Sequence, residues 1–145
     1  MLSEEQAVAI SAKWSLYFTQ YASGGDIQPF MDMFAETNQF ITNDKTLTVT
    51  KGDTDPASGI ISLAMLQEKM APEMKNLGYR QTIMTCKGVL GSSFAAEIKR
   101  YNKDWQNYYT QSLVIEVDDA GLISTVRAFS STTDSANTAM LSFAK

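Results

Sequence analysis

No histidine occurs in the 145 residues of this sequence. Histidine is the commonest side-chain ligand of metal ions, and it is the only residue whose unperturbed pKa lies near neutrality. Its absence excludes nucleophilic catalysis by Ser-His-Asp or Cys-His arrangements. A site on this chain therefore lacks both the usual general base and the usual metal ligand.

Cysteine is almost as scarce, because Cys86 is the only one. A single thiol cannot form an internal disulfide or a multi-cysteine metal site. Cys86 lies in a run with the composition of a strand, so we interpret it as a small buried residue rather than a nucleophile. The adjacent acids Asp118 and Asp119 lie in a predicted turn and are interpreted as solvated turn residues. We expect neither a metal ion nor a cofactor.

Positive charge and long apolar runs are also lacking. The formal net charge is −4, and the densest basic stretch, residues 99–103, is flanked by Glu97 and Asp104. Nucleic acids and anionic membranes attract clustered positive charge, so neither is an expected partner. No run approaches the roughly 18 apolar residues of a membrane span, and the acidic residues 1–5 do not form a secretory signal. We expect a soluble, cytoplasmic protein.

The residues that are present fit a single folded domain over positions 1–145. The chain is 44% apolar and 19% charged, which is ordinary for a globular protein. Ser3 and Gln6 form a capping-box pattern that starts a helix. Apolar residues then recur at helical spacing along one face: Ala7, Ile10, Trp14, Tyr17, Phe18 and Tyr21. A second helix is predicted over 26–34, with Asp26 as its cap, and a third between Asp55 and Gly78.

The remaining segments read as strands with short connections. They cover residues 38–42, 46–50, 79–87, 92–101, 107–117 and 122–131. Connections as short as these force neighbouring strands to be antiparallel. The pattern predicts an α+β fold in which three N-terminal helices pack on a curved antiparallel sheet whose last four strands form a meander.

Turns at 103–106 and 118–121 predict which side chains share a face of this sheet. The more apolar face is assigned to the helices, and it contains Phe94, Ala96, Ile98, Arg100, Tyr109, Gln111, Leu113, Ile115, Leu122, Val126 and Ala128. The opposite face is assigned to solvent or to a subunit interface, and it contains Glu97, Lys99, Tyr101, Tyr108, Thr110, Ser112, Glu116, Thr125, Arg127 and Phe129. The pattern does not decide which side of the strand 79–87 faces inward.

The inner face becomes polar toward one end, which is typical of a small-ligand pocket with apolar walls. Helix aromatics would form the opposite wall. The predicted ligand-binding residues are Trp14, Tyr17, Tyr21, Ile98, Arg100, Tyr109, Gln111, Ala128 and Ser130. Two plainer interpretations stay open: the aromatic stripe is ordinary core, and Arg100 packs its stem while its head reaches water.

Three stretches, residues 21–26, 30–40 and 121–129, together with the order of the elements, resemble the NTF2-like superfamily. That superfamily includes ketosteroid isomerase, scytalone dehydratase, limonene epoxide hydrolase and SnoaL-type cyclases. The resemblance implies a cone-shaped α+β fold around an apolar pocket. It also implies a habit of forming homodimers.

The catalytic groups of these relatives do not carry over. In the ketosteroid-isomerase-like pattern, Thr42 stands where the carboxylate base belongs and Phe18 where the tyrosine belongs. The epoxide-hydrolase-like pattern needs an acid where Ala128 stands, and the other candidate acid, Glu97, is predicted on the outer face. The dehydratase and cyclase patterns need histidine.

Two hypotheses follow. The first is a protein that binds a small apolar molecule, and that acts, where it acts as an enzyme, as a cyclase or isomerase without a strong internal base. The second is a non-enzymatic homodimeric interaction module that pairs through the outer face, where Tyr101, Tyr108, Ile123 and Phe129 are predicted to lie.

Overall fold

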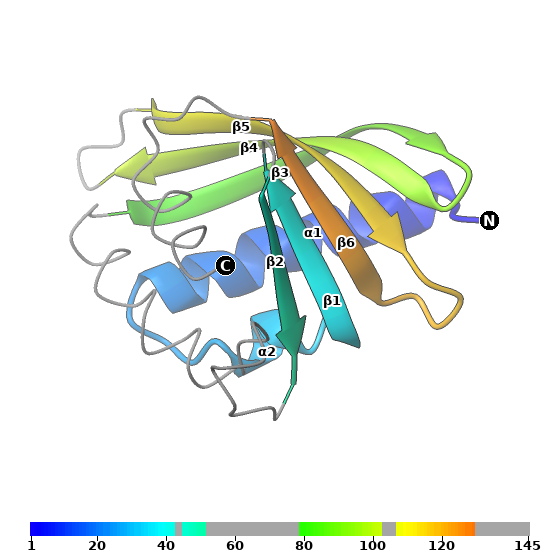
Figure 1. The fold of residues 1–145 in the computed structure, drawn as a ribbon. Helices are drawn as coiled ribbons and strands as arrows, with labels where there is room; N and C mark the ends of the chain where they lie inside the picture. The colour runs from blue at the N-terminus through cyan, green and yellow to red at the C-terminus, as the bar shows by residue number, and fades with distance from the viewer. Residues whose placement is uncertain (43–44, 52–78, 103–106, 130–145) are drawn as a thin grey trace.

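A computed structural model describes residues 1–42, 45–51, 79–102 and 107–129 of the chain. This part forms a mixed α+β fold with a long N-terminal helix and a curved sheet (Figure 1). Its elements are α1 (Glu4–Ala22), α2 (Gln28–Met31), β1 (Phe34–Thr42), β2 (Lys45–Thr50), β3 (Tyr79–Leu90), β4 (Ser93–Asn102), β5 (Asn107–Val117) and β6 (Ile123–Phe129). The prediction of three helices is not confirmed, because the described part has two and the third prediction falls outside it.

Helix α1 begins at the predicted capping box. The Gln6 backbone N–H donates to Ser3 Oγ at 3.1 Å, and the Ser3 N–H donates to Gln6 Oε1 at 2.8 Å. The Leu2 N–H also donates to the carbonyl of Gly91 at 3.0 Å, which ties the start of the helix to the turn between β3 and β4. Both ends of the capping box and this tether fix where α1 enters the fold.

Within the described residues, no helix is both long and apolar enough to cross a bilayer.

Helix α2 is shorter than the predicted span 26–34, and β1 begins at Phe34 rather than at residue 38. The prediction of Asp26 as the cap is wrong, because Ile27 is the cap residue; Asp26 Oδ1 accepts from the Gln28 N–H at 2.9 Å just before the helix. Pairing with a distant strand explains the early start of β1. Phe34 is the partner of Ile123, and the Ile123 N–H donates to the Met33 carbonyl at 2.9 Å. This long-range pairing overrides the local helical spacing.

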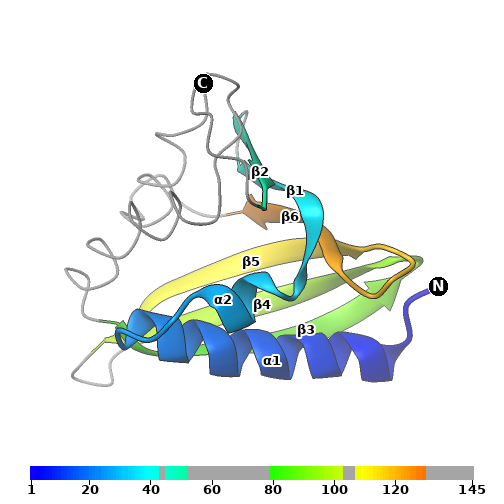
Figure 2. The same ribbon diagram turned by 90° about the horizontal axis from the view of Figure 1, so that it is seen from below.

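The six strands lie in the order β2-β1-β6-β5-β4-β3. The predicted meander from β3 to β6 is confirmed. The prediction of a wholly antiparallel sheet is wrong at one place, because β1 and β6 pair in parallel. Figure 2 shows α1 running along β3, β4 and β5 on one face of the sheet, with α2 beside it and β1, β2 and β6 on the other branch of the curve.

The register of β4 and β5 follows the prediction: Phe94 pairs with Ile115, Ile98 with Gln111, and Arg100 with Tyr109. The predicted register of β5 and β6 is wrong by two residues. Ile115 pairs with Val126 instead of Ser124, because one residue is added in the turn and a second by a bulge beside Val117.

A register shift of one residue would move every side chain of β6 to the opposite face. Because the total shift is two residues, Val126 and Ala128 still face inward, as predicted, and both are buried. Between the shifts the alternation is reversed. Ile123, predicted on the outer face, is the partner of Val117 and is fully buried. Leu122, predicted on the inner face, is only partly buried, and Thr125, predicted on the outer face, is buried.

The structure also decides the strand for which the sequence left two possibilities. Thr82 and Met84 are buried, whereas Ile83 is 38% exposed. The inner face of β3 therefore carries Thr82, Met84 and Cys86. Cys86, interpreted from the sequence as a buried residue, is only partly buried and packs against the core.

Candidate functional site

Three aromatic residues of α1 form one wall of the candidate site. Trp14, Phe18 and Tyr21 follow one another at helical spacing, and all three are buried. The Trp14 and Phe18 ring centroids lie 6.4 Å apart in a stacked arrangement, and those of Phe18 and Tyr21 lie 5.9 Å apart edge to face. Tyr17, a predicted wall residue, lies at the flank of this stripe and is only partly buried.

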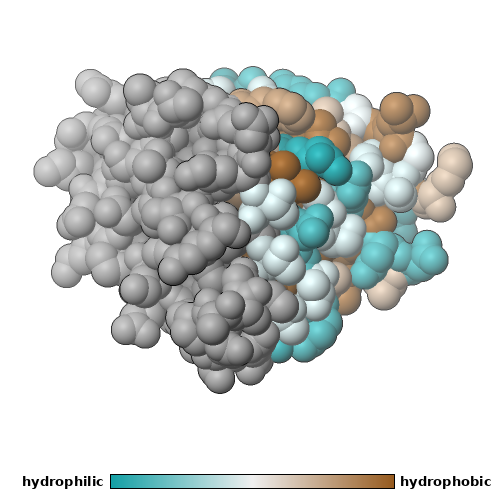
Figure 3. Space-filling view, viewed as in Figure 1, coloured by the Kyte–Doolittle hydropathy of each residue, from teal (hydrophilic) through white to brown (hydrophobic). Residues whose placement is uncertain are grey.

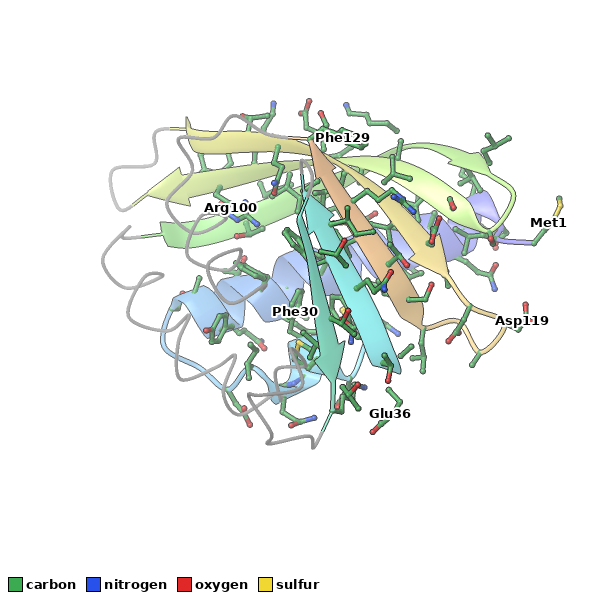
Figure 4. All side chains as sticks on the ribbon, in the orientation of Figure 1. Met1, Phe30, Glu36, Arg100, Asp119 and Phe129 are labelled. Carbon is green, nitrogen blue, oxygen red and sulfur yellow. The ribbon has the colours of Figure 1, made fainter. Side chains whose placement is uncertain are left out.

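Phe30 of α2 and Phe34 of β1 extend the aromatic wall. The Phe30 ring meets Trp14 at 4.8 Å, Phe18 at 5.1 Å and Phe34 at 5.1 Å between centroids. Phe30 lies beside α1 in Figure 4. Edge-to-face contacts of this kind add to the stability that apolar burial gives. They also fix the direction of each ring, so this wall is rigid.

The inner face of the sheet forms the opposite wall, and its character changes from row to row. One row across the strands consists of Phe94, Ile115 and Val126, all buried and apolar. Three rows further along β4, Arg100 pairs with Thr82 on one side and Tyr109 on the other. Polar side chains therefore gather at one end of an apolar face, as the sequence predicts.

Arg100 joins the two walls. Its side chain is 7% exposed and lies on the α1 side of β4 (Figure 4). The guanidinium carbon is 5.2 Å from the centroid of the Phe18 ring. A cation held over an aromatic face away from water gains on the order of 2 kcal/mol. The predicted alternative, in which the Arg100 head reaches water, does not fit this burial.

Gln111 and Tyr21 place further polar groups on the two walls. Gln111 is 3% exposed and pairs with Ile98, so it lies diagonally across from Arg100 on the same face. Tyr21 is buried on α1, and burial raises the pKa of its phenol to about 12. The phenol therefore keeps its proton at neutral pH and can donate a hydrogen bond.

The acids near the sheet lie on the other side. Glu97 approaches Lys99 at 3.6 Å, and Glu116 approaches Arg127 at 4.0 Å, with all four side chains substantially exposed. Among the residues that the structure describes, no carboxylate is buried and no group of acids or cysteine could hold a metal ion. Asp118 serves the turn before β6, because its Oδ1 accepts from two backbone N–H groups at 2.9 Å.

Six of the nine predicted ligand residues are buried in the structure: Trp14, Tyr21, Ile98, Arg100, Gln111 and Ala128. Ala128 pairs with Leu113 and Thr42 rather than opposite Gln111. Tyr109 is the backbone partner of Arg100, and its side chain lies outside the described residues. Ser130 also lies outside them.

Sequence reasoning missed three residues of this site. Phe18 was noted as part of the aromatic stripe but was not included among the ligand residues, although it contacts Arg100. Phe30 falls within the predicted second helix, 26–34, and no local signal reveals that its ring contacts three others. Thr82 was missed because the inward side of its strand was undecided; the apolar residue Met84, two positions away, was the available signal.

No protein-family model matches the sequence, and a comparison with curated proteins finds no relative. Solved structures do match. A candidate isomerase of the SnoaL-like family from Agrobacterium tumefaciens is 13% identical, with a TM-score of 0.55 over 88% of this chain and 98% of its own. A de novo designed NTF2 fold protein is 14% identical, with a TM-score of 0.52 over 87% of this chain and 85% of its own.

A de novo designed protein with a curved β-sheet gives a TM-score of 0.61 at 11% identity, covering 95% of this chain and 97% of its own. Identities this low carry information about the fold alone. The likeness extends over nearly the whole length of both chains in each comparison. The curved sheet named for this designed protein agrees with the curved sheet described above. The fold of this chain is NTF2-like.

Proposed function

We propose that this chain binds a small, largely apolar molecule that carries a hydrogen-bond acceptor, such as a carbonyl or carboxylate oxygen, between α1 and the inner face of the sheet. The observation that carries the proposal is the burial of Arg100 and Gln111 on an otherwise apolar face. Polar groups are costly to bury, and a few of them on apolar walls is the usual composition of a small-molecule site.

Each wall has a distinct part in this proposal. The apolar body of the ligand packs against the rings of Trp14, Phe18 and Phe30, whose mutual contacts hold them in place. Its acceptor is oriented by the side chains of Arg100 and Gln111 at the polar end. The candidate isomerase of the SnoaL-like family shares this fold, which is compatible with a small-molecule role, but the proposal rests on the side chains of the inner face.

We also propose that any turnover at this site is cyclisation or isomerisation of a ligand that is already reactive. The described interior offers hydrogen-bond donors and a cation, but no carboxylate. Donors of this kind stabilise negative charge that develops on an oxygen. Proton abstraction by a strong base is not part of the proposal, because a neutral hydroxyl or amide does not remove a proton near neutral pH without a neighbouring base.

Binding of naphthalene-2-carboxylate to the purified protein tests the proposal. We expect Arg100→Met and Gln111→Met each to weaken binding at least tenfold, or about 1.4 kcal/mol. Arg127→Met is the matched control, because Arg127 is exposed on the outer face, and its affinity should equal that of the wild type. Equal affinities for the wild type and both inner-face variants would remove these roles. Native mass spectrometry would identify a molecule retained from expression.

The second candidate function is self-association through the outer face of the sheet. Phe129 supports it, because this side chain is 61% exposed near the end of β6 (Figure 4). It pairs with Ser112, which places it on the face opposite Arg100 and Gln111. A homodimer formed there would leave the inner face unchanged, so this candidate is compatible with ligand binding.

A further inference from the structure

Four side chains bury a polar atom that has no hydrogen-bond partner among the described residues. The atoms are Trp14 Nε1, Tyr21 OH, Thr82 Oγ1 and Gln111 Nε2. The exposed fractions of these residues are 4%, 5%, 1% and 3%. Buried polar atoms in folded proteins are nearly always satisfied, so each such atom requires an explanation.

All four atoms can act as hydrogen-bond donors. The indole Nε1 and the amide Nε2 can only donate, whereas the two hydroxyl groups can donate or accept. The pKa of Tyr21, which burial raises to about 12, leaves its phenol protonated at neutral pH. Among the described residues, no buried side-chain carbonyl or carboxylate oxygen lacks a partner. Acceptor oxygens would therefore satisfy all four atoms.

The four donors come from both walls. Phe18 makes ring contacts with Trp14 and Tyr21 on α1, and it also contacts the Arg100 guanidinium of the sheet. Arg100 is in turn the strand partner of Thr82. Gln111 pairs with Ile98, two residues from Arg100 on the same face. The helix wall supplies two of the donors and the sheet wall the other two.

We propose that the site takes a flat apolar ligand with acceptor oxygens on two separate edges, one directed at Tyr21 and Trp14 of α1 and the other at Gln111 and Thr82 of the sheet. The inference rests on the proposed function and specifies its ligand class as a compound with at least two carbonyl or ether oxygens. Ligands that present ammonium or amide N–H groups at those edges are rejected, because a donor facing a donor leaves both unsatisfied.

A matched series of naphthalenes tests this polarity by isothermal titration calorimetry. The probes are naphthalene, 2-acetylnaphthalene, 2,6-diacetylnaphthalene and 2,6-bis(aminomethyl)naphthalene. We expect affinity to rise with each acetyl group and the diamine to bind more weakly than naphthalene. Equal affinity for all four probes would overturn the two-edged polarity while leaving apolar binding intact. Failure of every probe to bind would overturn the proposed function together with this inference.

Variants locate the two edges. Tyr21→Phe and Gln111→Met remove one donor from each wall at nearly constant volume. Each should lower the affinity for the diacetyl probe about tenfold and leave that for naphthalene unchanged. Gln111→Glu replaces the donor by acceptor oxygens and should reverse the preference toward the diamine. A role in folding alone would not cause that reversal.

Ser112→Ala is the control for Gln111, because Ser112 is the next residue on β5 and is exposed on the opposite face. Its affinities should match those of the wild type for every probe. Circular dichroism checks that each variant is folded. Equal losses for naphthalene and for the diacetyl probe in Tyr21→Phe and Gln111→Met would mean that these side chains only shape the site, and would overturn the inference.

Discussion

Phe18 is the residue on which the interior depends most. Its ring touches Trp14, Tyr21 and Phe30, and it carries the Arg100 guanidinium on its face at 5.2 Å. A cation at this depth needs such a partner, because desolvation disfavours charge. The phenyl ring of Phe18 has no hydroxyl group, so it holds the cation on its face and offers no hydrogen bond.

Tyr21 gives a prediction at the same scale. The pKa of its phenol is raised from 10.0 to about 12 by burial. Below pH 10 the phenol is protonated in both the folded and the unfolded chain, so it contributes no pH dependence. Between about pH 10 and pH 12 the unfolded chain loses the proton while the folded chain keeps it. The free energy of unfolding should therefore fall as the pH rises through this window.

Urea denaturation of the wild type and Tyr21→Phe at pH 8, 10 and 11 measures this contribution. The variant should lose less stability than the wild type between pH 10 and pH 11, because it lacks the ionising group. Other tyrosines titrate in both proteins and cancel in the comparison. Parallel pH profiles for the two proteins would show that Tyr21 ionises as easily in the folded state as in the unfolded state.

At the scale of elements, the contact between α1 and β3 provides hydrogen-bond partners for backbone groups at an edge of the sheet. Strand β3 is the last in the sheet order, so half of its backbone groups face away from β4. Two hydroxyl groups of α1, one turn apart, accept hydrogen bonds from backbone N–H groups at this edge. The Met84 N–H donates to Ser15 Oγ at 2.8 Å, and the Thr82 N–H donates to Thr19 Oγ1 at 2.9 Å. The helix therefore covers the edge and fixes the distance between the two walls of the site.

Removing these hydroxyl groups tests the importance of the contact. Ser15→Ala and Thr19→Val each leave a part-buried backbone N–H without its acceptor, and each should lower the free energy of unfolding by about 1 to 3 kcal/mol. Amide hydrogen exchange should accelerate at Met84 in the first variant and at Thr82 in the second. Ser11→Ala is the control, because Ser11 Oγ donates only to the Ala7 carbonyl within α1.

A loss in Ser11→Ala as large as that in Ser15→Ala would contradict this account, since the effect would then come from the helix itself. Exchange rates at Thr82 and Met84 that do not respond to either variant would contradict it as well. The variants should also weaken ligand binding less than the inner-face substitutions do, because neither hydroxyl is a proposed ligand contact.

The elements also show what the sequence can and cannot predict. The β4–β5 register followed from turn length and alternation, and it correctly placed Ile98, Arg100 and Gln111 together. The β5–β6 register failed, because the bulge beside Val117 leaves no trace in the apolar pattern. The early start of β1 failed for a related reason, since its pairing partner Ile123 is distant in the sequence.

Strand alternation predicts the part of the candidate site that lies on the sheet, but it does not predict the contacts between the sheet and the helices. Arg100 and Gln111 were found because a polar residue on an apolar face is visible in the alternation. The contact of Arg100 with Phe18 depends on how α1 crosses the sheet, which no local pattern encodes. The same is true of Phe30, whose place is set by the packing of α2 against α1.

At the scale of the whole molecule, the fold does not determine the function. A designed protein with a curved sheet matches this chain with a TM-score of 0.61, so the architecture alone does not require any particular ligand. Function therefore has to be argued from the side chains on the inner face. The outer surface is mixed in composition. Polar and apolar residues are interspersed over the described part of the surface in Figure 3, and Phe129 is the largest exposed apolar side chain of β6.

Self-association through Phe129 is the last prediction. Stable dimers bury roughly 800 Å² on each partner, and the exposed ion pairs Glu97–Lys99 and Glu116–Arg127 make this face too polar for an obligate interface. We therefore expect a weak homodimer that dissociates in the range of tens of micromolar, about 6 to 7 kcal/mol. Sedimentation velocity at roughly 5 to 200 μM protein spans this dissociation constant and measures it.

Phe129→Asp should be monomeric throughout this range, because association would bury a charge without a partner. Leu90→Asp is the control: Leu90 is 86% exposed at the end of β3, beside the turn to β4 and away from Phe129. It should associate as the wild type does. A monomeric wild type would remove the interface. Dissociation in Leu90→Asp but not in Phe129→Asp would move it from the sheet face to the β3–β4 turn.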